Sequence, residues 1–218
     1  MTGSWAEGHS IATRHHVRRR GGKVVRRLIA LLVLIGPAPT FGTVLLTQEQ
    51  ALKQMFPDAD KSVRVARLLT PDQAAEVLNG LGGKWTLYPA GSRSEQSTEY
   101  DSVVFFFASK KGQQIGVAMI EAQPGKWGHT HLIVALDTAG KVTNLAVMSY
   151  VEQHGRPIAT RRFLNQFIGK TADNPIQVGK DVDAVSGATV ISRAAAFAVK
   201  KVVVLYKTVY LTGSDRKR

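Results

Sequence analysis

The stretch DVDAVSGAT, residues 181–189, places two carboxylates upstream of a threonine that has small neighbours and leads into an alanine-rich run. A threonine hydroxyl is a weak nucleophile and needs a base or a metal-bound partner to react. The nearest histidine in the sequence is His154, and nothing marks it as a base for this threonine. A self-contained hydrolase is therefore a poor interpretation, and we expect no catalytic residue in the segment.

The same segment offers an accessible hydroxyl. Gly187 can adopt backbone conformations closed to other residues, and Ala188 leaves little bulk beside Thr189. Asp183 supplies a carboxylate suited to a metal ion held by another protein. These features favour a substrate for modification, and a nearby helix start would let backbone N–H groups hold a phosphate. The alternative is that Ser186 or Thr189 simply caps the last helix.

The elements that must position this segment predict an α+β domain, an antiparallel sheet built from hairpins with flanking helices. Four β-like runs, paired by glycine-bearing turns, indicate strands in two hairpins; they lie at residues 102–109, 113–122, 130–138 and 141–151. Thr47 with Gln50, and Thr70 followed by Pro71, are typical of helix starts. Helices are expected at residues 47–57, 70–83, 159–169 and 192–206, and a polar loop at 88–101.

The composition limits the possible chemistry. The chain has 218 residues and no cysteine, which excludes disulfides, thiolate nucleophiles, Cys-ligated metal clusters and CxxCH haem. Redox chemistry would therefore need a bound organic cofactor. His129 and His131 alternate at a strand start and share a face, but no third ligand is in view, so we expect no metal site.

The net charge of +13 is concentrated at the ends of the chain. The first 27 residues carry seven Lys or Arg and one acid, Glu7, and an uncharged run follows at 28–46. This layout is typical of a secretory signal or membrane anchor, and it predicts that the rest of the chain is exported. We expect a leader at 1–46, one domain at 47–212 and a basic tail at 213–218. Nucleic-acid binding is not expected, because the body of the chain shows no basic stripe.

The segment from Asp183 to Thr189 matches D-x-x-(S/T)-G-A-T, the signature of the FMN-binding domain family found in flavin subunits of Nqr- and Rnf-type complexes. The resemblance implies that Thr189 carries FMN through a phosphoester bond. It implies that Asp183 and Ser186 to Ala188 form the recognition segment. It also implies a maturation partner, an exported, magnesium-dependent flavin transferase that uses FAD as the donor.

Other segments extend the resemblance over about residues 100–205. The run GKWGHTHLIVALDTAGKVTNLAVM is similar to the family's glycine loop and paired strands, which places Trp127 and Gly128 near the flavin. The run VEQHG is similar to the family's E-T-P-G segment and keeps Glu152 and Gly155 at the same spacing, although Gln153 and His154 replace its Thr-Pro.

The resemblance implies an exported electron-transfer flavoprotein with covalent FMN and a membrane-bound or periplasmic redox partner. Tyr150 and Phe163, with Trp127, are candidates to flank the flavin ring or else core residues. Arg161 and Lys170 are candidates to stabilise reduced flavin or else solvated charges. A non-redox sensory or assembly module with the same fold remains the alternative.

Overall fold

The computed structural model describes residues 42–87, 102–125, 128–151 and 156–212. The chain divides into two compact units, 1–38 and 39–218, and every described residue belongs to the second unit. Residues 1–41 of the predicted leader, the polar loop at 88–101 and the basic tail lie outside the described residues. So do three of the residues expected near the flavin, Trp127, Glu152 and Gly155.

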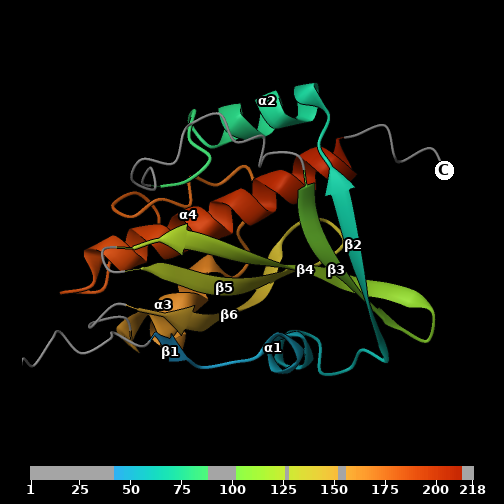
Figure 1. Ribbon diagram of the computed structural model, residues 1–218, viewed down its shortest axis with the longest axis horizontal. Coiled ribbons are helices and arrows are strands. Elements are labelled where there is room, and N and C mark those ends of the chain that lie inside the picture. Colours follow the sequence, from blue (N-terminus) through green and yellow to red (C-terminus); the bar gives the residue numbers. More distant parts are fainter. Residues whose placement is uncertain (1–41, 88–101, 126–127, 152–155, 213–218) are drawn as a thin grey trace, which may run out of the picture. The chain divides into compact units, whose positions relative to one another are not determined.

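A six-stranded antiparallel sheet forms the centre of the domain, in the order β1-β6-β5-β4-β3-β2 (Figure 1). The strands are β1 (Thr43–Val44), β2 (Lys61–Leu68), β3 (Ser102–Lys110), β4 (Gln113–Pro124), β5 (His129–Leu136) and β6 (Val142–Tyr150). The two predicted hairpins are confirmed as β3–β4 and β5–β6. The sheet with its flanking helices confirms the predicted α+β class.

The two edge strands are missing from the sequence-based prediction. Strand β2 is exposed along nearly its whole length, so it has no buried face to produce a period-two pattern. Strand β1 pairs with the end of β6, Thr43 opposite Tyr150, although the sequence pattern places this stretch in the leader. The sheet therefore begins within the range 1–46.

Two early helices start where their capping signals predict. Helix α1 (Gln48–Met55) has a capping box between Thr47 and Gln50. Helix α2 (Pro71–Gly80) has the same arrangement between Thr70 and Gln73, with its proline in the first turn. Each capping box satisfies two backbone N–H groups that the helix itself leaves unbonded.

Helices cover both faces of the sheet (Figure 1). Helix α4 (Thr189–Tyr206) crosses one face, where its valines and alanines join the larger hydrophobic cluster with residues of β3 to β6 and of α2. Helix α1 packs on the other face through Ala51, Met55 and Phe56. A π-helical stretch, Lys207–Leu211, continues α4.

The helix predicted at 159–169 is wrong in its length. Three short pieces take its place: a 3-10 turn (Arg156–Ala159), α3 (Arg161–Leu164) and another 3-10 turn (Asn165–Phe167). They bury Phe163, Leu164 and Phe167. Among the helices that the structure describes, none has the length and apolar character needed to cross a membrane.

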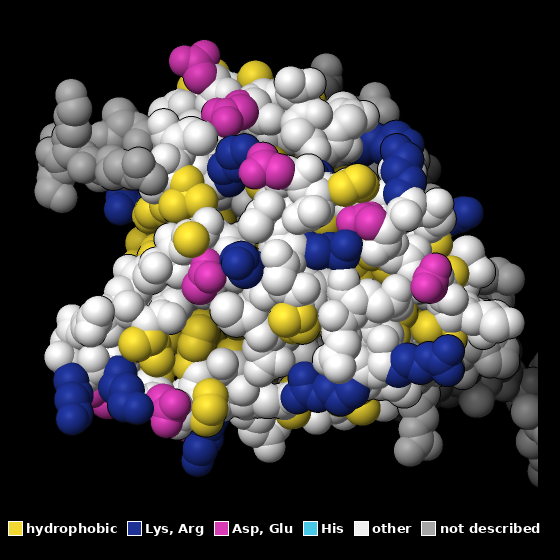
Figure 2. Space-filling view, turned by 180° about the vertical axis from the view of Figure 1, so that it is seen from behind, with side chains coloured by type: hydrophobic (Ala, Val, Ile, Leu, Met, Phe, Trp, Pro, Cys, Tyr) yellow, Lys and Arg dark blue, Asp and Glu magenta, His cyan; other side chains and the backbone are white. Residues whose placement is uncertain are grey.

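Figure 2 shows one face of the molecule, on which acidic and basic side chains are interspersed with small hydrophobic patches. Exposed charged side chains among the described residues form ion pairs, such as Lys110–Asp58 at 3.5 Å and Lys207–Asp173 at 2.6 Å. The visible face is therefore of mixed charge.

Candidate functional site

Thr189 is the first residue of α4 and is exposed. The N-cap residue is Ala188, which has no side-chain oxygen to offer the first turn. Among the described residues, the hydroxyl groups of Ser186 and Thr189 have no hydrogen-bond partner. The capping alternative is therefore wrong for both residues, and α4 begins three residues before the predicted Ser192.

A tight turn delivers the chain to Thr189. The Ala188 N–H donates to the Val185 carbonyl at 2.9 Å. Gly187 has φ +74°, a left-handed conformation that glycine adopts easily, as the sequence predicts. Ser192, fully buried on the first turn of α4, accepts from the Val185 N–H at 3.1 Å and donates to the Ala188 carbonyl at 2.8 Å. Ser192 therefore fixes the turn to the helix, a role that sequence reasoning missed.

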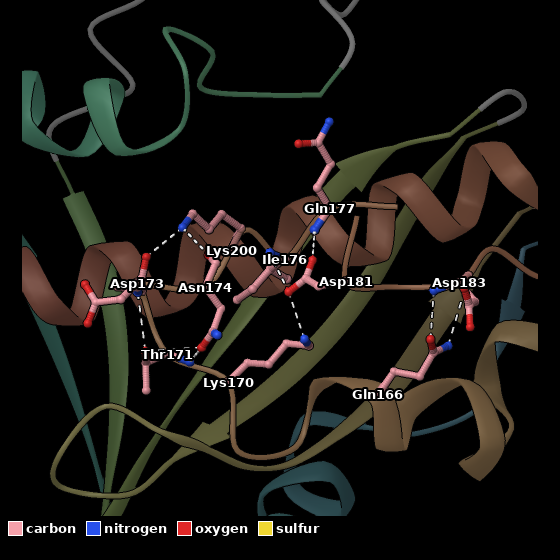
Figure 3. Close-up of polar contacts among 11 residues, drawn as sticks. Gln166, Lys170, Thr171, Asp173, Asn174, Ile176, Gln177, Asp181, Asp183 and Lys200 are labelled. Atoms are coloured by element: carbon pink, nitrogen blue, oxygen red, sulfur yellow. Dashed lines mark hydrogen bonds and ion pairs between the residues drawn. The ribbon is translucent and has the colours of Figure 1, made fainter. Parts of the chain in front are cut away.

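Upstream of the turn, the backbone of Asp183 is held by the side chain of Gln166 (Figure 3). The Asp183 N–H donates to Gln166 Oε1 at 2.8 Å, and Gln166 Nε2 donates to the Asp183 carbonyl at 3.3 Å. Asp183 itself is exposed, and its carboxylate has no hydrogen-bond or ion-pair partner among the described residues. One side-chain amide thus fixes the backbone and leaves the carboxylate free.

Asp181 organises the preceding loop (Figure 3). Its carboxylate accepts from the backbone N–H groups of Ile176 at 3.1 Å and Gln177 at 2.8 Å, and from Lys170 Nζ at 2.8 Å. Partial burial raises the carboxyl pKa, but the hydrogen bonds from Lys170 and from the two N–H groups outweigh it, so the pKa lies below 3.8. Asp181 is therefore a structural anion that the sequence analysis did not single out.

The two cations considered for stabilising reduced flavin are engaged elsewhere. Lys170 forms the ion pair with Asp181, and both side chains are largely buried. Arg161 donates to Asn144 Oδ1 at 3.3 Å and is exposed. In this structure Lys170 stabilises the loop, and Arg161 connects α3 to β6.

A cavity of about 590 Å³ lies between α3 and the segment before Thr189. Its lining residues are Thr160, Arg162, Phe163, Gln166, Asp183, Ala184, Val185 and Ser186. Residues of the predicted recognition signature thus border a space in the size range of ordinary ligand pockets, about 300–1,000 Å³. The lining combines apolar walls with one cation, Arg162, one carboxylate, Asp183, and several hydrogen-bonding groups.

The other predicted flavin neighbours have packing roles. A Cβ placed on Gly128 would lie 2.7 Å from the Val151 side chain, so glycine permits close approach of the β5 start to the end of β6. Tyr150 and Phe163 are both buried in the larger core cluster, and Phe163 also borders the cavity. Their interpretation as core residues is therefore confirmed, while contact with a ligand remains a prediction.

His129 and His131 lie on the same strand with their ring centroids 6.4 Å apart. His131 Nδ1 lies 3.0 Å from Ser149 Oγ. Burial and the neighbouring His129 lower the His131 pKa below 6.5, against an opposing effect of Glu121. No group of three or more metal-ligating side chains is found within the part of the chain that the structure describes.

The domain is therefore of the α+β class and has an unbonded threonine hydroxyl at a helix start. The segment before this threonine, up to Ser186, borders a cavity, whose lining does not include Thr189 itself. Residues 125–204 match the family model described as FMN-binding domain, which confirms the resemblance seen in the sequence.

Two curated relatives share part of the chain. A component of the ion-translocating oxidoreductase complex from Aliivibrio fischeri strain ES114 is 36% identical over 115 residues, which are 47% of this chain and 55% of the relative. The same component from strain MJ11 is 35% identical over the same extent. The chain spans about half the length of the curated relatives it matches. The crystal structure of Shewanella oneidensis NqrC is similar at TM-score 0.45 and 18% identity, covering 72% of this chain and 84% of that one.

Proposed function

We propose that this protein is an exported electron-transfer flavoprotein that carries FMN esterified to Thr189. The observation that supports this most strongly is the state of the Thr189 side chain, which is exposed and has no hydrogen-bond partner among the described residues. A hydroxyl that an outside enzyme must reach needs this accessibility. The match of residues 125–204 to the FMN-binding domain family agrees with the cofactor.

The residues present fit a phosphate ester at this position. Helix α4 has 18 residues and no side-chain cap at its N-terminus. The N–H groups of its first turn can therefore bind a phosphate, with support from the helix dipole. The adjacent cavity of about 590 Å³, bordered by Phe163 and Val185, has room and apolar surface for a planar ring.

The attachment balances chemically with FAD as the donor. The Thr189 hydroxyl attacks the flavin-side phosphorus, the new Oγ–P bond forms, and the pyrophosphate bond breaks with AMP as the leaving group. The hydroxyl proton passes to a base, and we propose that the flavin transferase supplies it. The free Asp183 carboxylate is available to that enzyme's magnesium ion.

FMN, when bound, supplies one- and two-electron transfer. The chain's own residues would hold the phosphate at the start of α4, orient the ring against the wall formed by Phe163 and Val185, and place Arg162 at the rim. The matched relatives are named as subunits of ion-translocating oxidoreductase complexes. By analogy, we propose a membrane-bound or periplasmic redox partner for this chain.

The test is intact-mass measurement of the full chain after co-expression with a flavin transferase. The wild-type protein should gain the mass of one FMN esterified with loss of water, and its yellow colour should remain with the denatured polypeptide. Thr189→Val should remove both signals. The control, Thr212→Val, changes an exposed threonine after the far end of α4 and should retain them.

Covalent flavin on Thr189→Val would show that another residue is the acceptor. A wild-type protein that stays colourless with an active transferase present would favour the alternative of a non-redox module. Masses that lack the N-terminal segment would show in the same spectrum that the leader has been removed.

A further inference from the structure

Gln166 connects the turn after α3 with the irregular segment that precedes α4. It lies in the 3-10 turn after α3 and is 17 residues from Asp183, whose backbone it bonds at both the N–H and the carbonyl. The buried neighbours Phe163, Leu164 and Phe167 fix that turn to the core. Gln166 therefore ties the Asp183 backbone, in a segment without helix or strand structure, to a turn that is packed into the core.

The other backbone contacts of the segment lie on either side of Asp183. Upstream, the Gly179 N–H bonds the Val182 carbonyl at 3.0 Å. Downstream, Val185 is bonded to Ser192 on α4. Among the described residues, the two contacts from Gln166 are the hydrogen bonds that hold the Asp183 backbone, and Asp183 and Ala184 are both exposed. Loss of the Gln166 amide would free the middle of the segment while both ends stay attached.

We propose that Gln166 is a positioning residue for modification, which holds the Asp183 backbone in the position, relative to the turn and Thr189, that the flavin transferase recognises. This inference rests on the proposed function. The interaction surface consists of the free Asp183 carboxylate, the exposed turn at Ser186 and Gly187, and the Thr189 hydroxyl. The partner is an enzyme that contacts the Asp183 carboxylate and the Thr189 hydroxyl at the same time. The distance between these two groups must therefore be fixed before the enzyme binds.

A positioning role predicts a particular kinetic signature. If the transferase binds only the held conformation, lowering its population raises the apparent KM for the acceptor protein in proportion and leaves kcat unchanged. Losing two hydrogen bonds, each with a modest net effect on stability, should raise KM by about tenfold or more. The final extent of loading should remain complete, because Thr189 itself is intact.

The experiment measures flavin incorporation into the purified full-length acceptor by intact mass, over a range of acceptor concentrations, with FAD, Mg²⁺ and a flavin transferase. Gln166→Ala should show the raised KM. Gln166→Glu should raise KM as well, because it keeps an acceptor for the Asp183 N–H but places a second oxygen against the Asp183 carbonyl. The matched control is Gln177→Ala, because that side chain makes no hydrogen bond among the described residues and borders a different cavity. It should behave as wild type.

Amide hydrogen exchange on the unloaded proteins gives a readout that needs no transferase. A peptide covering residues 181–189 should exchange faster in Gln166→Ala, while peptides from α4 beyond residue 195 should be unchanged. Should Gln166→Ala fail to fold, Gln166→Glu provides the same comparison.

Unchanged KM in the folded Gln166 variants, an equal rise in Gln177→Ala, or a lower kcat at constant KM would each overturn the positioning role. Failure of the proposed function looks different, because the wild-type chain would then take up no flavin at any concentration.

Discussion

The domain contains two regions that are held together in different ways. Where α4 crosses the sheet, buried Val, Ala, Leu and Phe side chains provide most contacts, and a single ion pair, Lys201–Glu121, is buried among the described residues there at 2.8 Å. The segment at 170–188 has no helix or strand beyond one bridge, Val178 to Val182. Besides backbone–backbone bonds, hydrogen bonds between side chains and backbone hold it in shape (Figure 3).

The packed region mainly determines the stability of the domain, whereas the polar segment mainly determines the position of the residues before Thr189. Apolar burial is spread over many residues, so each contributes a part of the domain's stability. The polar segment depends on a few side chains, each with several backbone partners; Lys200, for example, donates to the carbonyls of Ala172 at 2.6 Å and Asn174 at 2.7 Å. Substitutions that disrupt buried contacts in the first region should therefore lower the stability of the domain most, and those in the second should have a smaller effect on stability and displace the segment that precedes Thr189.

The largest effect is expected from Lys201→Met. It leaves the Glu121 carboxylate buried without its cation, and breaking a buried pair in this way costs about 3–5 kcal/mol. The cation–π contact of Lys201 with Trp85, at 4.6 Å from the ring centroid, is lost as well. Urea denaturation should show the midpoint fall sharply. The control Lys207→Met removes an exposed pair with Asp173 and should leave the midpoint nearly unchanged. Equal midpoints for the two variants would contradict the comparison.

A smaller effect is expected from Asp181→Ala, which removes three hydrogen bonds from a largely buried carboxylate. Because Lys170 keeps partial access to water, the unfolding free energy should fall by about 1–3 kcal/mol. Proteolysis under native conditions should cut first within residues 172–182. Cleavage there at the wild-type rate would show that the loop does not depend on Asp181.

The same carboxylate predicts a pH dependence. Its pKa is lowered in the folded state, so the unfolded chain binds a proton more readily in acid. The stabilisation by Asp181 is therefore complete above about pH 3.8 and is lost as the pH falls below that value. Asp181→Asn should flatten this part of the stability curve, and an unchanged slope would assign it to other carboxylates.

Most of the fold could be predicted from the sequence because its signals are local. The capping boxes at Thr47 and Thr70 involve residues three apart, and β3 to β6 show buried faces or turn residues directly in the chain. Strand β2 lacks such a signal because an exposed edge strand is defined by its neighbour. Helix α3 ends after four residues and continues as a 3-10 turn, which the sequence pattern does not reveal, because Phe163 and Phe167 would share one face of a regular helix as well.

The candidate site was predictable where its residues are adjacent in the sequence. The turn at Gly187 and the exposure of Thr189 follow from the small residues around them. Gln166 and Ser192 could not be found in this way, because both act on backbone atoms of the segment, at separations of 17 and seven residues. Any residue type can offer its backbone N–H or carbonyl to a side chain, so the sequence does not show which residue is the partner. A three-dimensional structure is needed to reveal these contacts.

The smallest effect is expected in the packed region, from Thr130→Val. Thr130 is fully buried on β5, and its hydroxyl has no hydrogen-bond partner among the described residues, in contrast to the largely buried carboxylate of Asp181. Valine has nearly the same shape and removes the unsatisfied group, so the unfolding free energy should rise by about 1 kcal/mol. Thr143→Val is the matched control, because the Thr143 hydroxyl donates to the Ala135 carbonyl at 3.3 Å and its loss should not stabilise the domain. Thermal unfolding of both variants decides the matter: a lower midpoint for Thr130→Val would mean that this hydroxyl has a partner, and that polar bonding extends from the segment into the packed sheet.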